Sequence, residues 1–154
     1  MPSLHLRITI ATQTIEVWRE EGLLKSYPVS TSKFGLGTEA ESFKTPLGAF
    51  QICEKHGAGE SLHAIFKGRK PVGEWSPDRP SGEEDLILAR ILRLHGLEKE
   101  NSNSYDRYIY IHGTNKEDQI GTPASHGCIR MKNSDVAELY DLVPLGTAVQ
   151  ISMT

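Results

Sequence analysis

The first third of the chain alternates between apolar and polar positions, which is the period of a strand with one buried face. Residues 4–10 follow this alternation, with Leu and Ile on one face and polar side chains on the other. Residues 14–18 repeat it, and residues 23–31 form a third apolar stretch after the turn residues 20–22. Strands spaced this closely predict hairpins, and therefore an antiparallel sheet or barrel.

The next part of the chain is richer in glycine and proline. Residues 33–44 are polar and predict a loop, and residues 45–48 predict a turn into a fourth strand over residues 49–53. Residues 56–85 contain few periodic apolar positions. We interpret them as a long loop over the sheet and a candidate lid over a functional site, because long loops of this kind are often functional. Trp75 either belongs to that lid or anchors the loop to the sheet.

The second half of the chain predicts two more core strands, one helix and a final strand. Residues 86–94 are rich in Ile and Leu, which favours a buried strand over a short helix, and residues 108–111 alternate Tyr with Ile. Residues 133–135 offer N-cap side chains for a helix that Pro144 and Gly146 would end. Its apolar face comprises Val136, Leu139, Tyr140 and Val143. With a last strand over 147–152, the fold class is mainly β, sandwich-like or barrel-like, with one helix in the C-terminal half.

Length and charge narrow the functional classes. The chain has 154 residues, which predicts one domain over residues 1–154, and its formal net charge of −3 argues against nucleic acid as a partner. No stretch approaches the roughly 18 apolar residues of a membrane span, so we expect no membrane partner. The first residues lack the pattern of a secretory leader, which predicts a cytoplasmic protein. The alternative is the periplasm or cell envelope, if a leader has been removed.

The residues with the clearest chemical signal surround one of the two cysteines. Cys128 follows His126 and Gly127, and His112 stands directly after the predicted strand 108–111. A nearby histidine promotes formation of the reactive thiolate, so the pattern fits a nucleophile with its base. Gly127 permits a tight turn whose N–H groups would hold an oxyanion. Arg130 is suited to binding a substrate carboxylate.

Two other interpretations of the same residues stay open at this point. A lone cysteine is most often a small apolar residue that only packs. His112, His126 and Cys128 are also possible zinc ligands, although their spacing matches no common zinc motif. We therefore expect no metal and no cofactor. Cys53 lies in a predicted strand and is interpreted as a packing residue, so a disulfide between it and Cys128 would abolish activity.

Several segments together match a known family. They are Tyr-Pro-Val-Ser-Thr at 27–31, Lys-Thr-Pro-Leu-Gly-Ala-Phe at 44–50, Ile-His-Gly-Thr at 111–114, Ser-His-Gly-Cys-Ile-Arg-Met at 125–131 and Gly-Thr-Ala-Val at 146–149. In this order they resemble the YkuD-type L,D-transpeptidase catalytic domain. The resemblance covers nearly the whole chain and implies a largely β fold. It also implies a cysteine acyl-enzyme mechanism on peptidoglycan stem peptides or muropeptides.

The resemblance assigns roles residue by residue. Cys128 matches the nucleophile and His112 the base, with the carbonyl of Gly113 orienting the imidazole. His126 matches a second histidine with a local structural or electrostatic role. The N–H groups of Gly127 and Cys128 match the oxyanion site.

Substrate contacts are expected from four further residues, namely Ser125, Thr114, Arg130 and Arg90. Arg130 stands where other branches of the family carry Asn. Arg90 interrupts an apolar run, so an edge-exposed position is the alternative to substrate binding.

The activity that we expect is an L,D-carboxypeptidase that removes the terminal D-Ala from stem tetrapeptides in cell-wall recycling. The absence of a leader pattern favours it over an L,D-transpeptidase, which passes the same acyl group to an amine. A non-catalytic muropeptide-binding module is the alternative from another class. The family also predicts that carbapenems acylate the thiol. The oligomeric state is left open by the sequence.

Overall fold

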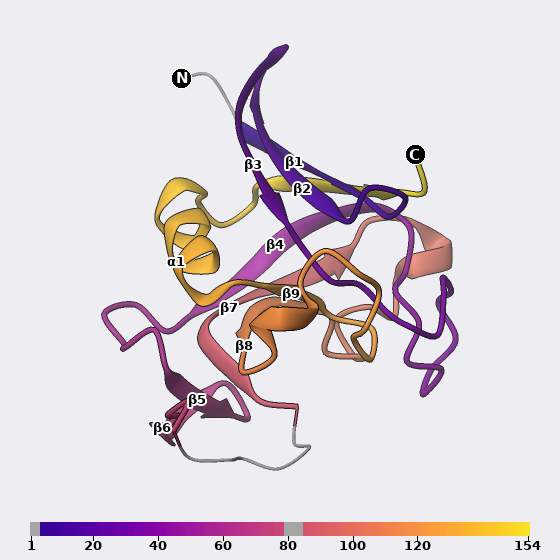
Figure 1. The fold of residues 1–154 in the computed structure, drawn as a ribbon. Helices are drawn as coiled ribbons and strands as arrows, with labels where there is room; N and C mark the ends of the chain where they lie inside the picture. The colour runs from indigo at the N-terminus through magenta and orange to yellow at the C-terminus, as the bar shows by residue number, and fades with distance from the viewer. Residues whose placement is uncertain (1–3, 79–84) are drawn as a thin grey trace.

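One branched β-sheet carries the fold (Figure 1). The computed structural model describes residues 4–78 and 85–154, and within them it contains ten strands, one α-helix and two short 3₁₀ helices. The strands are β1 (Leu4–Thr9), β2 (Thr14–Arg19), β3 (Gly22–Pro28), β4 (Gly48–His56), β5 (Ala64–Lys67), β6 (Lys70–Glu74), β7 (Ile87–Gly96), β8 (Tyr110–Thr114), β9 (Ile129–Met131) and β10 (Ala148–Ser152). The helices are α1 (Asn133–Leu142), η1 (Lys99–Asn101) and η2 (Glu117–Gln119).

Strand β7 is the branch point of this sheet. The order is β3-β2-β1-β10-β4-β7-β5-β6, and β8 also pairs with β7 and carries β9 on its other edge. Most neighbouring strands are antiparallel as predicted, but β1 pairs with β10 and β8 pairs with β9 in parallel. The hydrophobic pattern did not predict these parallel pairs, because the two strands of each pair are joined by a long stretch of chain instead of a hairpin turn.

The main core lies between the sheet and α1. The predicted inward positions of the first strands are fully buried, among them Leu6, Ile8, Ile15 and Val17. The helix packs against β7 and β8 (Figure 1) with Val136 and Leu139 buried. Apolar burial of this kind is the main driving force for folding.

The predicted strand over 86–94 and the predicted helix are both confirmed, with β7 and α1 in those places. The predicted N-cap is wrong. Lys132 occupies that position without a side-chain bond to the helix, because the Asn133 side chain is used elsewhere.

The prediction of a long irregular loop over residues 56–85 is wrong for residues 64–74, which form the β5–β6 hairpin. Gly68 and Arg69 both have positive φ, at +55° and +67°, which suits a two-residue hairpin turn. Every residue of β6 is exposed, so this edge strand leaves no hydrophobic alternation in the sequence. Trp75 packs against the main core, which agrees with the anchoring alternative. The central part of the predicted lid, residues 79–84, lies outside the described residues.

Among the described residues, no helix has both the length and the apolar character needed to cross a membrane.

Asn133 ties the helix to the strand that bears His112. Its Oδ1 accepts the Thr114 N–H at 2.8 Å and its Nδ2 donates to the Thr114 carbonyl at 3.1 Å. The side chain is buried, so no water can replace these bonds. Asn133 thus fixes the end of β8 against the start of α1.

We predict that Asn133→Ala lowers the free energy of unfolding by about 2–4 kcal/mol, because it leaves two buried backbone groups unpaired. Urea denaturation measures this change. Ser134→Ala, at the exposed neighbouring position, is the control and should stay within about 0.5 kcal/mol of wild type. Equal stability of the two variants would show that the hydrogen bonds from Asn133 to Thr114 do not stabilise the fold.

Candidate active site

Cys128 stands at the end of a tight turn that leads into β9. Gly127 has φ +117°, a conformation that favours glycine, and its carbonyl accepts a 3.0 Å hydrogen bond from Thr45 Oγ1. On the other side of the turn, Ser125 Oγ donates to the Cys128 carbonyl at 2.6 Å. The Gly127 N–H makes only a long 3.3 Å bond to the same Ser125 hydroxyl. The turn that presents the thiol is therefore held from two directions.

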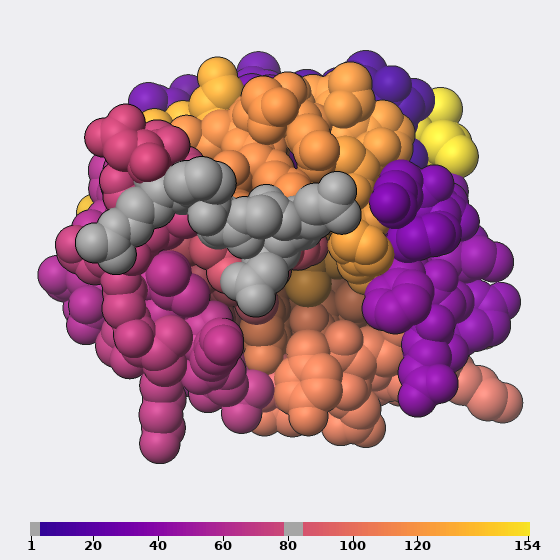
Figure 2. Space-filling model, turned by 60° about the horizontal axis from the view of Figure 1, so that its bottom comes forward, coloured from indigo at the N-terminus to yellow at the C-terminus, as the bar shows by residue number. Residues whose placement is uncertain are grey.

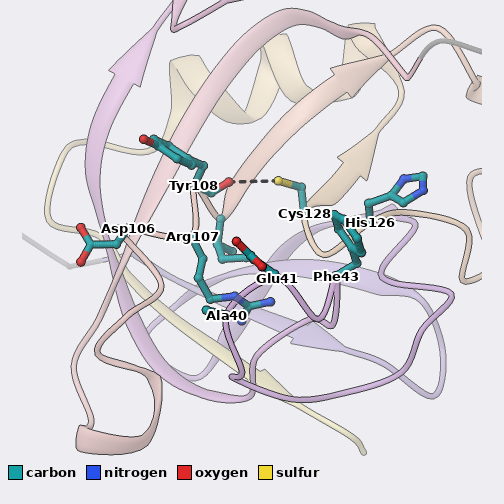
Figure 3. A pocket seen from close by; sticks show the side chains of 9 residues that line it. Ala40, Glu41, Phe43, Asp106, Arg107, Tyr108, His126 and Cys128 are labelled. Carbon is teal, nitrogen blue, oxygen red and sulfur yellow. Dashed lines mark hydrogen bonds between the residues drawn. The ribbon is translucent and has the colours of Figure 1, made fainter.

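The thiol itself rests against the start of β8. Cys128 Sγ donates to the Tyr108 carbonyl at 3.2 Å (Figure 3) and accepts the Tyr110 N–H at 3.3 Å. Tyr108 has φ +56°, which is uncommon for an aromatic residue. The strand that carries His112 thus also holds the sulfur.

His112 lies on β8, paired in register with Arg130 on the parallel strand β9. Its Nδ1 lies 2.5 Å from the Gly113 carbonyl. A carbonyl only accepts, so Nδ1 carries the proton, and in the neutral ring Nε2 is left as the basic nitrogen. A Cβ on Gly113 would come within 2.2 Å of Asn133 Oδ1 and 2.6 Å of the Leu88 carbonyl, so this position requires glycine.

Cys128 lines two cavities, and a third lies next to them. A recess of about 110 Å³ is lined by Asp85, Ile87, His112, Ser125, His126, Cys128 and Arg130. A larger cavity of about 360 Å³ is lined by Ala40, Glu41, Phe43, Asp106, Arg107, Tyr108, Ile109, His126 and Cys128 (Figure 3). Tyr108 also borders a third cavity of about 530 Å³ beside the β5–β6 hairpin. Figure 2 shows this face hollowed between that hairpin and the loop of residues 33–44.

Burial keeps both reacting groups neutral in the resting protein. Desolvation lowers the pKa of His112, although the Gly113 carbonyl and Asp85 oppose the shift. Desolvation also raises the pKa of the Cys128 thiol to about 11, only partly offset by the Tyr110 N–H. A neutral imidazole beside a neutral thiol can take the proton as the sulfur attacks.

His126 and Arg130 flank Cys128 in different environments. The His126 side chain is 44% exposed and lies between the rings of Phe34 and Phe43, with centroid distances of 5.7 Å to each. The Arg130 side chain is only 1% exposed, and its Nη2 lies 2.7 Å from Asp85 Oδ2. Its Nη1 donates to Gln119 Oε1 at 2.9 Å. Both terminal nitrogens of Arg130 are therefore bound inside the protein, whereas its buried Nε has no hydrogen-bond partner among the described residues.

Known proteins share this arrangement of sequence and fold. The sequence model of the L,D-transpeptidase catalytic domain, YkuD, matches residues 4–151. The chain belongs to this family. It is 30% identical over 148 residues to the L,D-transpeptidase relative YkuD of Bacillus subtilis (strain 168). The alignment covers 96% of this chain and 65% of that relative. The chain thus spans just under two thirds of the length of that relative.

Solved structures show the same fold. An L,D-transpeptidase from Mycobacterium smegmatis aligns over 98% of this chain and 59% of its own, with a TM-score of 0.64 and 19% identity. L,D-transpeptidase 3 from Mycobacterium tuberculosis, in complex with a faropenem-derived adduct, aligns over 98% of this chain and 60% of its own, with a TM-score of 0.61 and 19% identity. The predicted fold class is confirmed by these matches.

Most of the residues proposed from the sequence meet at one place in this L,D-transpeptidase domain. They are Cys128, His112, Gly113, His126, Gly127, Ser125 and Arg130. Tyr108 and Tyr110 line a cavity, although Tyr110 is also buried, and Ile109 and Ile111 belong to the main core. Cys53 and Cys128 are both free thiols.

Two proposed substrate contacts do not reach this place. Thr114 is buried and its backbone is bound by Asn133. Arg90 donates to the Glu60 carbonyl at 2.8 Å, and its guanidinium lies 5.7 Å from the Tyr140 ring centroid. Arg90 lies in a break in the β7–β8 register between Leu88 and Ile91. This break is a β-bulge, which redirects the Arg90 side chain.

Sequence reasoning missed two functional positions. Thr45 lies in the quoted segment 44–50, and that resemblance was a usable signal for it. Asp85 lies just before β7 and belongs to no periodic pattern, so only its contacts reveal it.

A metal site finds little support in the donor set. Within residues 4–78 and 85–154, no three His, Cys, Asp or Glu side chains gather as potential metal ligands.

We predict that the resting thiol reacts mainly above neutral pH. In a Cys53→Ala background, the rate of Cys128 alkylation by iodoacetamide should keep rising through pH 9–10, because the pKa of the thiol is raised to about 11. Mass spectrometry of quenched samples measures the rate. A plateau near neutral pH would instead indicate a preformed thiolate–imidazolium pair.

Proposed function

We propose that this L,D-transpeptidase-family domain is an L,D-carboxypeptidase that removes the terminal D-Ala from peptidoglycan stem tetrapeptides in cell-wall recycling. The observation that carries the proposal is the shared recess of Cys128 and His112, with the imidazole oriented by the Gly113 carbonyl so that Nε2 is the basic nitrogen. This is the arrangement of a nucleophile, a base and an orienting group. The cytoplasmic location and the stem-peptide substrate stay predictions.

The first half-reaction forms a thioester. Cys128 Sγ attacks the carbonyl carbon of the third stem residue while its proton passes to His112 Nε2. The N–H groups of Gly127 and Cys128 stabilise the oxyanion, and the long bond from Gly127 to Ser125 leaves that donor easy to redirect. The C–N bond then breaks, and His112 returns the proton to the amine of the departing D-Ala.

The second half-reaction is hydrolysis in this proposal. The recess of about 110 Å³ has room for several water molecules beside His112 and Cys128. A water there would lose a proton to His112 as it attacks the thioester. The thiol is regenerated and the tripeptide is released.

An L,D-transpeptidase activity is the second candidate, and a specific observation favours it. Two larger cavities of about 360 and 530 Å³ meet at Tyr108, whose carbonyl accepts the hydrogen bond of the thiol. Such an arrangement would accommodate a donor and an acceptor peptide. The relative YkuD of Bacillus subtilis carries the transpeptidase name.

The proposal predicts D-Ala release from purified tetrapeptide by the wild-type protein. Cys128→Ala should slow release on the order of a thousandfold or more, because it removes the nucleophile. Cys53→Ala is the matched control and should retain activity, since Cys53 lies on β4, its Sγ donates to the Arg93 carbonyl, and it does not line the recess of Cys128 and His112. Unchanged release by Cys128→Ala would refute the nucleophile assignment, and no release by wild type would favour a binding module.

The acceptor is identified from products of the same reaction. With tetrapeptide alone, and again with an added D-amino acid, we expect tripeptide as the main product by mass spectrometry. A dimer or an exchanged tetrapeptide as the main product would support the transpeptidase instead.

We also predict that a carbapenem acylates Cys128, because a β-lactam carbonyl offers the sulfur the same kind of electrophile. The faropenem-derived adduct on the Mycobacterium tuberculosis structure supports this expectation. Intact-protein mass spectrometry should show one adduct on wild type and on Cys53→Ala, and none on Cys128→Ala. An active enzyme without an adduct would contradict the prediction.

A further inference from the structure

Asp85 supplies the acidic partner of an arginine that is otherwise enclosed by protein. The Arg130 side chain is 1% exposed, and a charge at that depth requires a partner of opposite sign. Asp85 Oδ2 lies 2.7 Å from Arg130 Nη2, whereas Gln119 provides only a neutral acceptor for Nη1. Partial burial raises the pKa of Asp85, but the Arg130 hydrogen bond and charge outweigh this and hold the pKa below its usual range. Asp85 is therefore ionised at neutral pH.

Asp85 Oδ2 also lies close to His126, which precedes Cys128 in the sequence. Asp85 Oδ2 lies 3.4 Å from His126 Nδ1, so one atom contacts both residues that flank the Gly127–Cys128 pair. Asp85 also lines the recess that contains His112 and Cys128. It approaches from the segment before β7, which shares no local sequence with the turn at 125–128.

We propose that Asp85 is a positioning residue of the active site: it fixes Arg130 and His126 around Cys128 and places a negative charge beside the reacting pair. The assignment rests on the proposed function for its role in turnover. Its Oδ2 is bound by the two side chains that it positions, so the proposal assigns it a role that acts through them.

The charge of Asp85 acts on both reacting groups. The charged groups that face His112 are Asp85 and Arg130, and those that face Cys128 are the same two and Arg107. Asp85 opposes the burial effect at His112 and adds to it at Cys128, so it raises the pKa of each. When His112 takes the thiol proton, the imidazolium forms near this carboxylate, which stabilises it.

Removing the charge of Asp85 should change thiol alkylation and turnover in opposite directions. A purely structural role would slow both. In Asp85→Asn the pKa of Cys128 falls, because the negative charge is lost and Arg130 becomes unneutralised. Alkylation of Cys128 should then become faster at pH 8, with its midpoint at lower pH. Turnover should fall roughly 10- to 100-fold, the range expected for loss of a hydrogen bond to a charged group.

The experiment compares Asp85→Asn, Asp85→Glu and Asp141→Asn in the Cys53→Ala background. Asp141 lies exposed on α1 and controls for the change of net charge. Iodoacetamide alkylation across pH and D-Ala release from tetrapeptide are measured for each variant. We expect Asp85→Glu to restore the alkylation midpoint and part of the turnover, and Asp141→Asn to match wild type in both.

An Asp85→Asn midpoint equal to that of Asp141→Asn would overturn the proposal, and so would slower alkylation together with slower turnover. Circular dichroism verifies folding, and if Asp85→Asn is unfolded, Asp85→Ser removes the same charge with a smaller side chain and carries the same expectation. The alkylation readout needs no substrate. It therefore tests the positioning role even if wild-type protein releases no D-Ala, which would count against the proposed function alone.

Discussion

The parallel ladder between β8 and β9 is the interaction on which the site depends. It places His112 opposite Arg130, two residues beyond Cys128, so the base and the nucleophile come from adjacent strands. The first residue of β8, Tyr110, and the preceding Tyr108 hold the sulfur through their backbone groups. A shift of this register by one residue would turn His112 to the opposite face. The buried hydrogen bonds between the Asn133 side chain and the Thr114 backbone oppose such a shift, because they hold the end of β8 against α1.

Burial of this ladder determines the chemistry of the resting site. The pKa of His112 is lowered and that of Cys128 is raised, both chiefly by desolvation. The resting site therefore holds a neutral pair, and in the proposed reaction charge forms only as a substrate is attacked. Asp85 and Arg130 add opposite charges at the edge of the recess, so the field around the thiol combines burial with one ion pair.

Prediction from sequence succeeded where the signal was local. Period-two alternation located the first strands, and apolar spacing located α1, because each buries one face against the core. It failed for β6, whose residues are all exposed and so leave no pattern, and for the N-cap, since Asn133 bonds to a strand instead of its own helix. Arg90 interrupts an apolar run, and the sequence leaves substrate binding and an edge-exposed position open for it, because no local pattern marks the bulge in β7.

The sequence by itself determined the family and singled out the candidate nucleophile and base, because a thiol, an imidazole and two glycines occur at defined spacing within short segments. The positive φ of Gly127 is a property of the local chain, whereas Gly113 is required by its close approach to Asn133 and Leu88, which are distant in the sequence. Only the tertiary structure decided that Arg130 is an internal ion-pair partner and that Asp85 belongs to the site. Those roles depend on contacts that Asp85 makes with His126, 41 positions away in the sequence, and with Arg130, 45 positions away. No local sequence pattern encodes contacts between segments so far apart.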